Sequence, residues 1–108
     1  MATRKSQTSA SVSLPADRPI VGAIVADTHS RPHAQIDQWL ERDAPDFIVH
    51  AGDIGDLTVL DALEAHAPVF AVRGNIDGRA ARTPDIIVFD LKEGETSRLR
   101  IVVTHIAV

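Results

Sequence analysis

Residues 20–30 read IVGAIVADTHS, an apolar run that changes abruptly to four polar residues. Short apolar runs rich in β-branched residues are typical of strands that are buried on both faces of a sheet. The polar residues end the run, and Ser30 among them is a candidate helix cap. We therefore predict a buried strand over Ile20–Ala26, with Asp27 and His29 at its carboxyl end.

Strand and helix patterns alternate after this first run. Apolar residues at helical spacing predict one helix that ends before Pro45 and a second that follows Asp56 and ends at Pro68. Two further strand candidates separate and follow these helices, over Phe47–Val49 and Val69–Val72. A strand–helix–strand–helix–strand order predicts an α/β fold with a parallel sheet and right-handed connections.

The remainder of the chain has a different pattern. Ile86–Leu91 and Leu99–Thr104 are both strand-like, and a polar connector over Lys92–Arg98 joins them. The connector contains Gly94 and is too short for a helix, so the two runs predict a β-hairpin. We therefore expect the first βαβαβ part of a fold plus a hairpin.

Composition limits the classes of function. The chain has 108 residues, which predicts one domain, and its formal net charge is −4. No basic stripe indicates a nucleic-acid groove, and no apolar run approaches the roughly 18 residues of a membrane span. The absence of cysteine excludes disulfides, thiolate metal sites and cysteine nucleophiles, and it is compatible with a reducing compartment.

The N-terminal residues differ in composition from the rest of the chain. Residues 1–18 are rich in Ser, Thr and Ala and lack the apolar segment of a secretory signal. Low hydrophobicity predicts a disordered tail over residues 1–18, followed by one domain over residues 19–108. We expect a cytoplasmic protein.

Metal-binding residue types follow four of the predicted strands. They are Asp27 and His29, then Asp53, then Asn75, and finally His105. Ligands of parallel α/β sheets bind outside the carboxyl ends of the strands, so these side chains are expected at one edge. In an extended segment Asp27 and His29 leave the same face. Singly, each residue is more often a turn, cap or surface residue; their conjunction predicts a site for manganese, iron or zinc.

Other polar residues have weaker interpretations. His50 is a candidate supporting group beside the Gly52–Asp53 pair, whereas His33 and His66 are expected on solvated helix faces. Arg73 could face a phosphate or solvent, and Asp77 could be a site residue or the first residue of an Asp-Gly turn.

The motifs resemble those of a known family. D-x-H at Asp27 and His29, G-D at Asp53, G-N at Asn75 and a strand ending in His105 resemble the calcineurin-like metallophosphoesterases. ADTHS, VHAGDI and AVRGNID look like the versions found in the YfcE-like branch of small phosphodiesterases. The resemblance implies a metallophosphoesterase-type β-sandwich flanked by helices and a pair of divalent ions, with manganese preferred over iron, zinc or nickel.

The resemblance also implies a role for each residue. Asp27 and His29 would bind the first ion, Asp53 would bridge both ions, and Asn75 and His105 would bind the second. Asp53 and Asn75 would thus be catalytic as well as metal-binding. The implied reaction is hydrolysis of a small phosphate ester, a phosphodiester, by a metal-bound hydroxide.

Two positions depart from the family pattern. Ile76 replaces the histidine that follows Asn75 in many members, and the 108 residues contain no G-H-x-H ligand motif. We therefore expect the N-terminal portion of the domain, with open strand edges that could form a homo-oligomer. A non-catalytic scaffold, such as the related subunit of the retromer complex, is the alternative. A Rossmann-type nucleotide binder is disfavoured because ADTHS stands where G-x-G-x-x-G would be.

Overall fold

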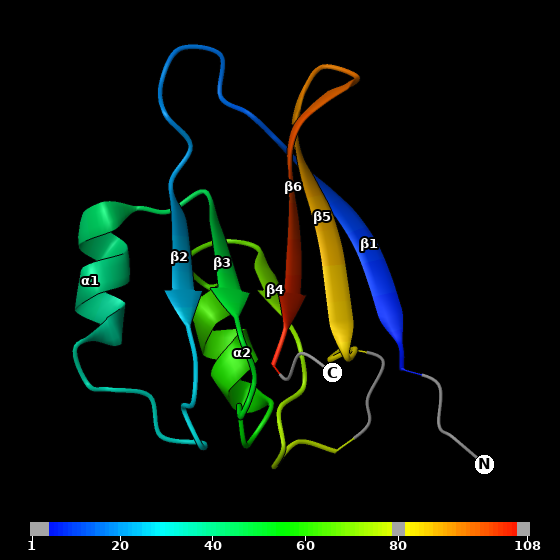
Figure 1. Cartoon of the computed structure of the whole chain (residues 1–108). Coiled ribbons are helices and arrows are strands. Elements are labelled where there is room, and N and C mark those ends of the chain that lie inside the picture. Colours follow the sequence, from blue (N-terminus) through cyan, green and yellow to red (C-terminus); the bar gives the residue numbers. More distant parts are fainter. Residues whose placement is uncertain (1–4, 79–81, 106–108) are drawn as a thin grey trace.

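The computed structural model describes residues 5–78 and 82–105. In this part of the chain two helices and two three-stranded sheets form (Figure 1). The parallel sheet, in the order β2-β3-β4, consists of β2 (Gly22–Val25), β3 (Phe47–His50) and β4 (Val69–Ala71). The mixed sheet, in the order β1-β5-β6, consists of β1 (Gln7–Ser13), β5 (Ile86–Glu93) and β6 (Thr96–Thr104). The helices are α1 (Ile36–Asp43) and α2 (Thr58–Glu64).

The parallel sheet is the middle of three layers. The two helices cover one face and the mixed sheet lies on the other (Figure 1). The middle position of this sheet follows from β3, because the side chains of β3 alternate between two hydrophobic cores, one on each face of the sheet. Ile48 packs with Leu60 and Leu63 of α2, whereas Phe47 and Val49 pack toward the mixed sheet. The predicted α/β sandwich flanked by helices is confirmed.

Aromatic packing closes the core between the two sheets. All three phenylalanines of the chain meet there. Phe70 stacks on Phe89 with ring centroids 5.0 Å apart, and Phe47 meets Phe89 edge-on at 5.5 Å. Such pairs contribute about 0.5–1.5 kcal/mol each beyond the area they bury. These contacts fix the distance between the parallel and mixed sheets.

Strand β2 is not buried on both faces, so this prediction is wrong. β2 pairs only with β3 among the described strands, and the Ile24 side chain is 78% exposed. Ala23 and Val25 pack against the helix-side core, which places Ile24 on the opposite face. The mixed sheet does not extend over that face of β2. The apolar run therefore forms an edge strand with one exposed face, and not the buried strand that was predicted.

The predicted disordered tail is also wrong over most of its length. Gln7–Ser13 forms β1, which pairs in parallel with β5 along its whole length. Ala10, Val12 and Leu14 alternate toward the core between the sheets. This period-two burial compensates for the low average hydrophobicity of the segment. Residues 1–4 of the predicted tail lie outside the described residues.

The hairpin prediction is confirmed with a shorter connection than expected. β5 and β6 pair antiparallel up to Glu93 and Thr96, so most of the predicted Lys92–Arg98 connector is strand. Gly94 turns the chain with a φ of 60°. Helix α1 ends before Pro45 as predicted, but its cap position is Gln35 and not Ser30.

Candidate metal centre

The strand directions bring the predicted site residues to one edge of the molecule. Strands β2, β3, β4 and β6 all end at the lower edge in Figure 1, where β1 and β5 begin. The loops that follow β2, β3 and β4 therefore lie together, and they carry Asp27, His29, Asp53 and Asn75. His105 follows the end of β6 at the same edge. The strand-end rule is sufficient to account for this gathering.

Backbone hydrogen bonds join the loop after β2 to the loop after β3. Asp27 donates to the Gly52 carbonyl at 3.0 Å, His29 donates to the Asp53 carbonyl at 3.0 Å, and Ser30 donates to the Ile54 carbonyl at 2.8 Å. These bonds continue the β2–β3 pairing beyond the regular strands. They hold Asp27 and His29 beside Asp53 without any contribution from side chains.

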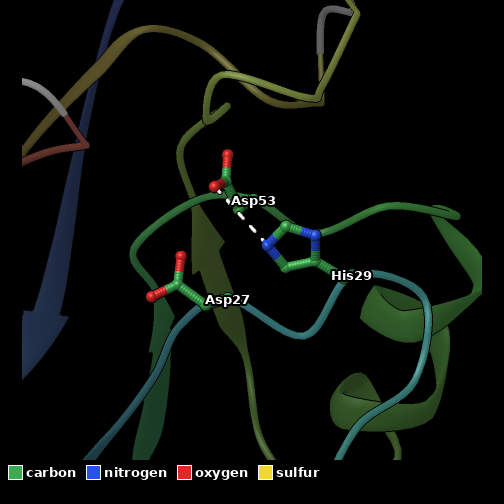
Figure 2. A group of neighbouring side chains, drawn as sticks. All are labelled: Asp27, His29 and Asp53. Carbon is green, nitrogen blue, oxygen red and sulfur yellow. Dashed lines mark ion pairs between the residues drawn. The ribbon is translucent and has the colours of Figure 1, made fainter.

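Asp27, His29 and Asp53 form a compact group of potential metal ligands (Figure 2). One ligand atom from each residue lies within 4.8 Å of the others. The Nε2 atom of His29 is 3.6 Å from Oδ2 of Asp53. Two ligands of one ion are roughly 3–4 Å apart when each bond is about 2.0–2.2 Å long. The residues present therefore fit a divalent ion.

The backbone of this group is left-handed. Asp27, His29 and Asp53 have φ angles of 56°, 46° and 57°. Such conformations cost about 1–3 kcal/mol each for residues other than glycine and are found at functional sites. The predicted extended geometry at Asp27 and His29 is therefore wrong, although their side chains do converge. The hydrogen bonds to Gly52, Asp53 and Ile54 offset this cost.

His105 approaches Asp53 from the end of β6. Its Nδ1 atom is 2.8 Å from the Ala51 carbonyl, which can only accept, so Nδ1 carries a proton and donates. The Nε2 atom can then act as a ligand, and it lies 3.6 Å from Oδ1 of Asp53. Gly52 makes this approach possible, because a Cβ atom there would lie 2.5 Å from Nδ1 of His105.

Asn75 lies on the loop after β4, and this loop packs directly on Asp53. The backbone N–H of Ile76 donates to Oδ1 of Asp53 at 3.2 Å. A Cβ atom at Gly74 would lie 2.1 Å from the Asp53 nitrogen, so only glycine permits the contact. Asn75 and His105 line one cavity of about 230 Å³. All five predicted ligands therefore lie in loops that contact one another.

His50 supports the group from within the core, as predicted. It is fully buried, and its Nδ1 accepts from the Gly52 backbone at 3.1 Å. Its Nε2 therefore donates to the Thr28 hydroxyl at 3.0 Å, which donates in turn to the Ile54 carbonyl at 2.9 Å. Burial lowers the pKa of His50 despite the nearby carboxylates of Asp77 and Asp27. The neutral imidazole thus holds together the loop after β2, through Thr28, and the loop after β3, through Gly52.

Asp77 is a supporting residue that the sequence left undecided. Its carboxylate accepts from the backbone N–H groups of Ile54 at 3.0 Å, Gly55 at 3.0 Å and Gly74 at 2.7 Å. Burial opposes ionisation, but these donors outweigh it and lower the pKa of Asp77. The predicted Asp-Gly turn is wrong, because the turn lies earlier, over Asn75 and Ile76, where the Asp77 N–H donates to the Gly74 carbonyl at 3.2 Å. The Asp77 carboxylate joins the loops after β3 and β4.

The remaining polar predictions have mixed outcomes. Arg73 is held by Asp85, with Nε and Oδ1 2.5 Å apart, and its side chain is 27% exposed. This ion pair and the Ser6 backbone lower the pKa of Asp85 to about 2. His66 contacts Asp37 at 3.0 Å, and His33 stacks on Trp39. Neither histidine lies within α1 or α2, so the predicted helix positions are wrong, and neither belongs to the ligand group.

Residues 21–107 match the family model of the calcineurin-like phosphoesterase superfamily domain. The chain belongs to this superfamily. It is 37% identical over 60 residues to the probable metallophosphoesterase MJ0623 of Methanocaldococcus jannaschii, covering 50% of this chain and 30% of that protein. The predicted superfamily is thereby confirmed, and membership of the YfcE-like branch stays a prediction.

A solved structure shares the fold of this superfamily member. The crystal structure of Chaetomium thermophilum Vps29 superposes with a TM-score of 0.56 at 18% identity, over 77% of this chain and 44% of that chain. The chain thus spans less than half the length of both similar proteins. Neither described helix is long and apolar enough to cross a membrane.

Proposed function

We propose that this protein is a metal-dependent phosphoesterase that hydrolyses phosphodiesters at the metal centre. The position of Asp53 between two histidines carries the proposal. Its Oδ2 is 3.6 Å from His29 Nε2, and its Oδ1 is 3.6 Å from His105 Nε2. A carboxylate whose oxygens face separate nitrogen ligands is suited to bridging two ions. Superfamily membership supports the same reaction class.

The ligands divide between two proposed ion positions. Asp27, His29 and Oδ2 of Asp53 would hold one ion, in agreement with their mutual approach within 4.8 Å. Oδ1 of Asp53, His105 and Asn75 would hold the other, because His105 and Asn75 line one cavity. Oxygen and imidazole ligands without thiolate favour manganese, with iron, zinc and nickel as the other candidates.

The ions, when bound, would lower the pKa of a water molecule and offset the negative charge of the phosphoryl group. The chain's own contribution is to hold Asp53 and Asn75 in fixed positions, through the loop contacts of His50 and Asp77. Ile76 is 52% exposed next to Asn75 and cannot donate a proton to a leaving group. We therefore propose substrates with good leaving groups, as in the YfcE-like branch.

Hydrolysis of bis(4-nitrophenyl) phosphate tests the proposal. The intact protein, as encoded in its reading frame, is compared with Asp53→Asn and with the charge-matched control Asp43→Asn. Asp43 is exposed on α1 and pairs only with neighbouring Arg42 among the described residues. We expect manganese-dependent turnover that falls by at least about 100-fold in Asp53→Asn and is unchanged in the control. Equal rates in all three proteins would exclude the assignment.

A non-catalytic scaffold is the second candidate, and the exposed Ile76 favours it. Calorimetric titration with Mn²⁺ separates the two functions. A phosphoesterase binds the ion and loses this affinity in Asp53→Asn. A scaffold keeps its cooperative fold and shows no affinity in either form.

A further inference from the structure

The cavity beside the metal centre contains two cations that the family motifs do not include. The cavity has a volume of about 230 Å³ and is lined by Lys5, Arg73, Gly74, Asn75, Asp85, Thr104 and His105. A group bound in this cavity would therefore contact proposed metal ligands on one part of the wall, and Lys5 with the Arg73–Asp85 ion pair on another. The arrangement is that of a subsite adjoining the reacting phosphate.

Arg73 is an unsuitable ligand for a further anion because its charge is already balanced. Asp85 accepts from Arg73 Nε at 2.5 Å, and Arg73 also donates to the Asp77 carbonyl at 3.3 Å. The Arg73 guanidinium is thus a structural part of the cavity wall. Its contacts fix the base of the cavity, between the start of β5 and the loop after β4.

Lys5 is the cation that is available for a ligand. Its side chain is exposed, and within residues 5–78 and 82–105 its ammonium makes no ion pair. An ammonium group on a flexible stem is a point charge that phosphate groups bind well. In a chain of net charge −4, a lysine beside the proposed metal centre lowers the local repulsion of a phosphate.

The backbone next to Lys5 is held in place by hydrogen bonds. Ser6 donates from its nitrogen to Asp85 Oδ2 at 2.8 Å, and its hydroxyl accepts from the Asp85 nitrogen at 3.0 Å. Its carbonyl accepts from Ile86 at 3.0 Å. Asp85 therefore connects Arg73 to the start of β1. These bonds place Lys5 at the cavity even though it precedes the first strand.

The segment that carries Lys5 lies outside the region matched by the superfamily, which begins at residue 21. β1 runs parallel to β5, so the start of β1 lies at the edge where β6 ends (Figure 1), just before His105. The segment that leads into β1 therefore brings to the cavity a residue that the superfamily motifs do not specify.

We propose that Lys5 is a specificity-determining residue that binds a second phosphate group of the substrate. This inference rests on the proposed phosphodiesterase function. The substrate class is a phosphodiester with a phosphomonoester on the same molecule. Lys5 contacts that second phosphate while the diester lies at Asp53, Asn75 and His105. The competing possibility is that Lys5 only reduces the negative potential around Asp85.

A matched pair of substrates tests the proposal. Thymidine 5′-(4-nitrophenyl phosphate) is compared with the same compound that carries a 3′-phosphate, in manganese-loaded intact protein. We expect kcat/KM to be roughly fivefold higher for the 3′-phosphate compound, as one exposed ion pair of about 1 kcal/mol allows. Lys5→Gln removes this preference through KM, and Lys5→Arg retains it.

Lys92→Gln is the control, since Lys92 is the second lysine of the chain and lies near the opposite end of β5. It should keep the preference. The proposal is overturned if Lys5→Gln leaves the preference intact, or lowers the rate on both esters by the same factor. The second result would assign to Lys5 only a general electrostatic role.

A binding measurement separates failure of this proposal from failure of the phosphoesterase assignment. Metal-free protein in EDTA is titrated with inorganic phosphate while the backbone amide signals of Ser6 and Gly74 are followed by NMR. We expect the dissociation constant to rise at least about threefold in Lys5→Gln and to stay constant in Lys92→Gln. Equal constants in all forms overturn the Lys5 proposal whether or not either ester is hydrolysed.

Discussion

The carboxylate of Asp77 accepts the backbone N–H of Ile54 through both of its oxygens, at 3.1 Å and 3.0 Å. This contact links two loops that lie far apart in the sequence, one after β3 and one after β4. Gly55 and Gly74 donate to the same carboxylate. Asp77 thus fixes the separation of the loops that carry Asp53 and Asn75.

Replacement of Asp77 by alanine should destabilise the fold and weaken metal binding together. The N–H groups of Ile54, Gly55 and Gly74 lose their acceptor, and each such loss at a buried group costs about 1–3 kcal/mol. We expect the free energy of unfolding, measured with urea, to fall by about 3 kcal/mol. Asp17→Ala, at an exposed loop position, should change it by less than about 0.5 kcal/mol. Similar losses in both variants would contradict this role.

The pair formed by Asp85 and Arg73 predicts a pH dependence of stability. The pKa of Asp85 falls from 3.8 to about 2 in the folded chain, because of the Arg73 side chain first and the Ser6 backbone second. A lowered folded pKa stabilises the protein above the unfolded pKa, and this contribution is lost as pH falls through the folded pKa. The stability that Asp85 adds is therefore lost between about pH 4 and about pH 2.

Asp85→Asn isolates this contribution from those of other carboxylates that titrate in the same range. Urea unfolding is measured for both proteins at several pH values. We expect the wild-type advantage to be constant above about pH 4 and to shrink toward pH 2. An advantage that does not change across this range would show that the Asp85 charge has no net effect on stability.

Packing on the two faces of the parallel sheet predicts very different losses of stability when two isoleucines are truncated to alanine. Ile48 is fully buried in β3, whereas Ile24 is 78% exposed in β2. Truncation of a buried isoleucine to alanine costs about 2–5 kcal/mol, and an exposed one usually less than about 0.5 kcal/mol. Thermal and urea unfolding of Ile48→Ala and Ile24→Ala measure the difference. An equal loss would place Ile24 against a partner surface in solution.

The contrast between these residues also explains which parts of the fold the sequence predicts. Both isoleucines lie in short apolar runs, and local pattern alone gives each the same buried strand. The difference is set by which strand is central, and that depends on contacts far along the chain. The strand over Gln7–Ser13 was missed because its Ser and Thr content hides the alternation of Ala10, Val12 and Leu14.

The site was more predictable than the strands around it. Asp27, His29 and Asp53 were placed together by one rule, that parallel strands end at the same edge. The roles of Asp77 and Asp85 could not be read in this way. Their partners are backbone groups and an arginine from other loops, and a backbone N–H leaves no trace in a sequence. The left-handed backbone at His29 is likewise set by its bond to the Asp53 carbonyl.

Gly74 offers the sharpest test of the contact between the loops. A Cβ atom at this position would lie 2.1 Å from the Asp53 nitrogen and 2.2 Å from its Oδ1, closer than side chains tolerate. Gly74→Ala must therefore push the Asn75 loop away from Asp53. We expect Mn²⁺ affinity in calorimetry to fall by at least about tenfold, the scale seen when groups behind a metal ligand are changed.

Gly78→Ala is the matched control, because a Cβ atom at Gly78 meets no described atom within 4 Å. It should bind Mn²⁺ like the wild type and be slightly more stable, since alanine restricts the unfolded chain more than glycine does. If Gly74→Ala unfolds the protein, Gly74→Ser will not rescue it, because the obstacle is the Cβ atom itself. Normal Mn²⁺ affinity in a folded Gly74→Ala protein would mean that the Asn75 loop does not contribute to the metal centre.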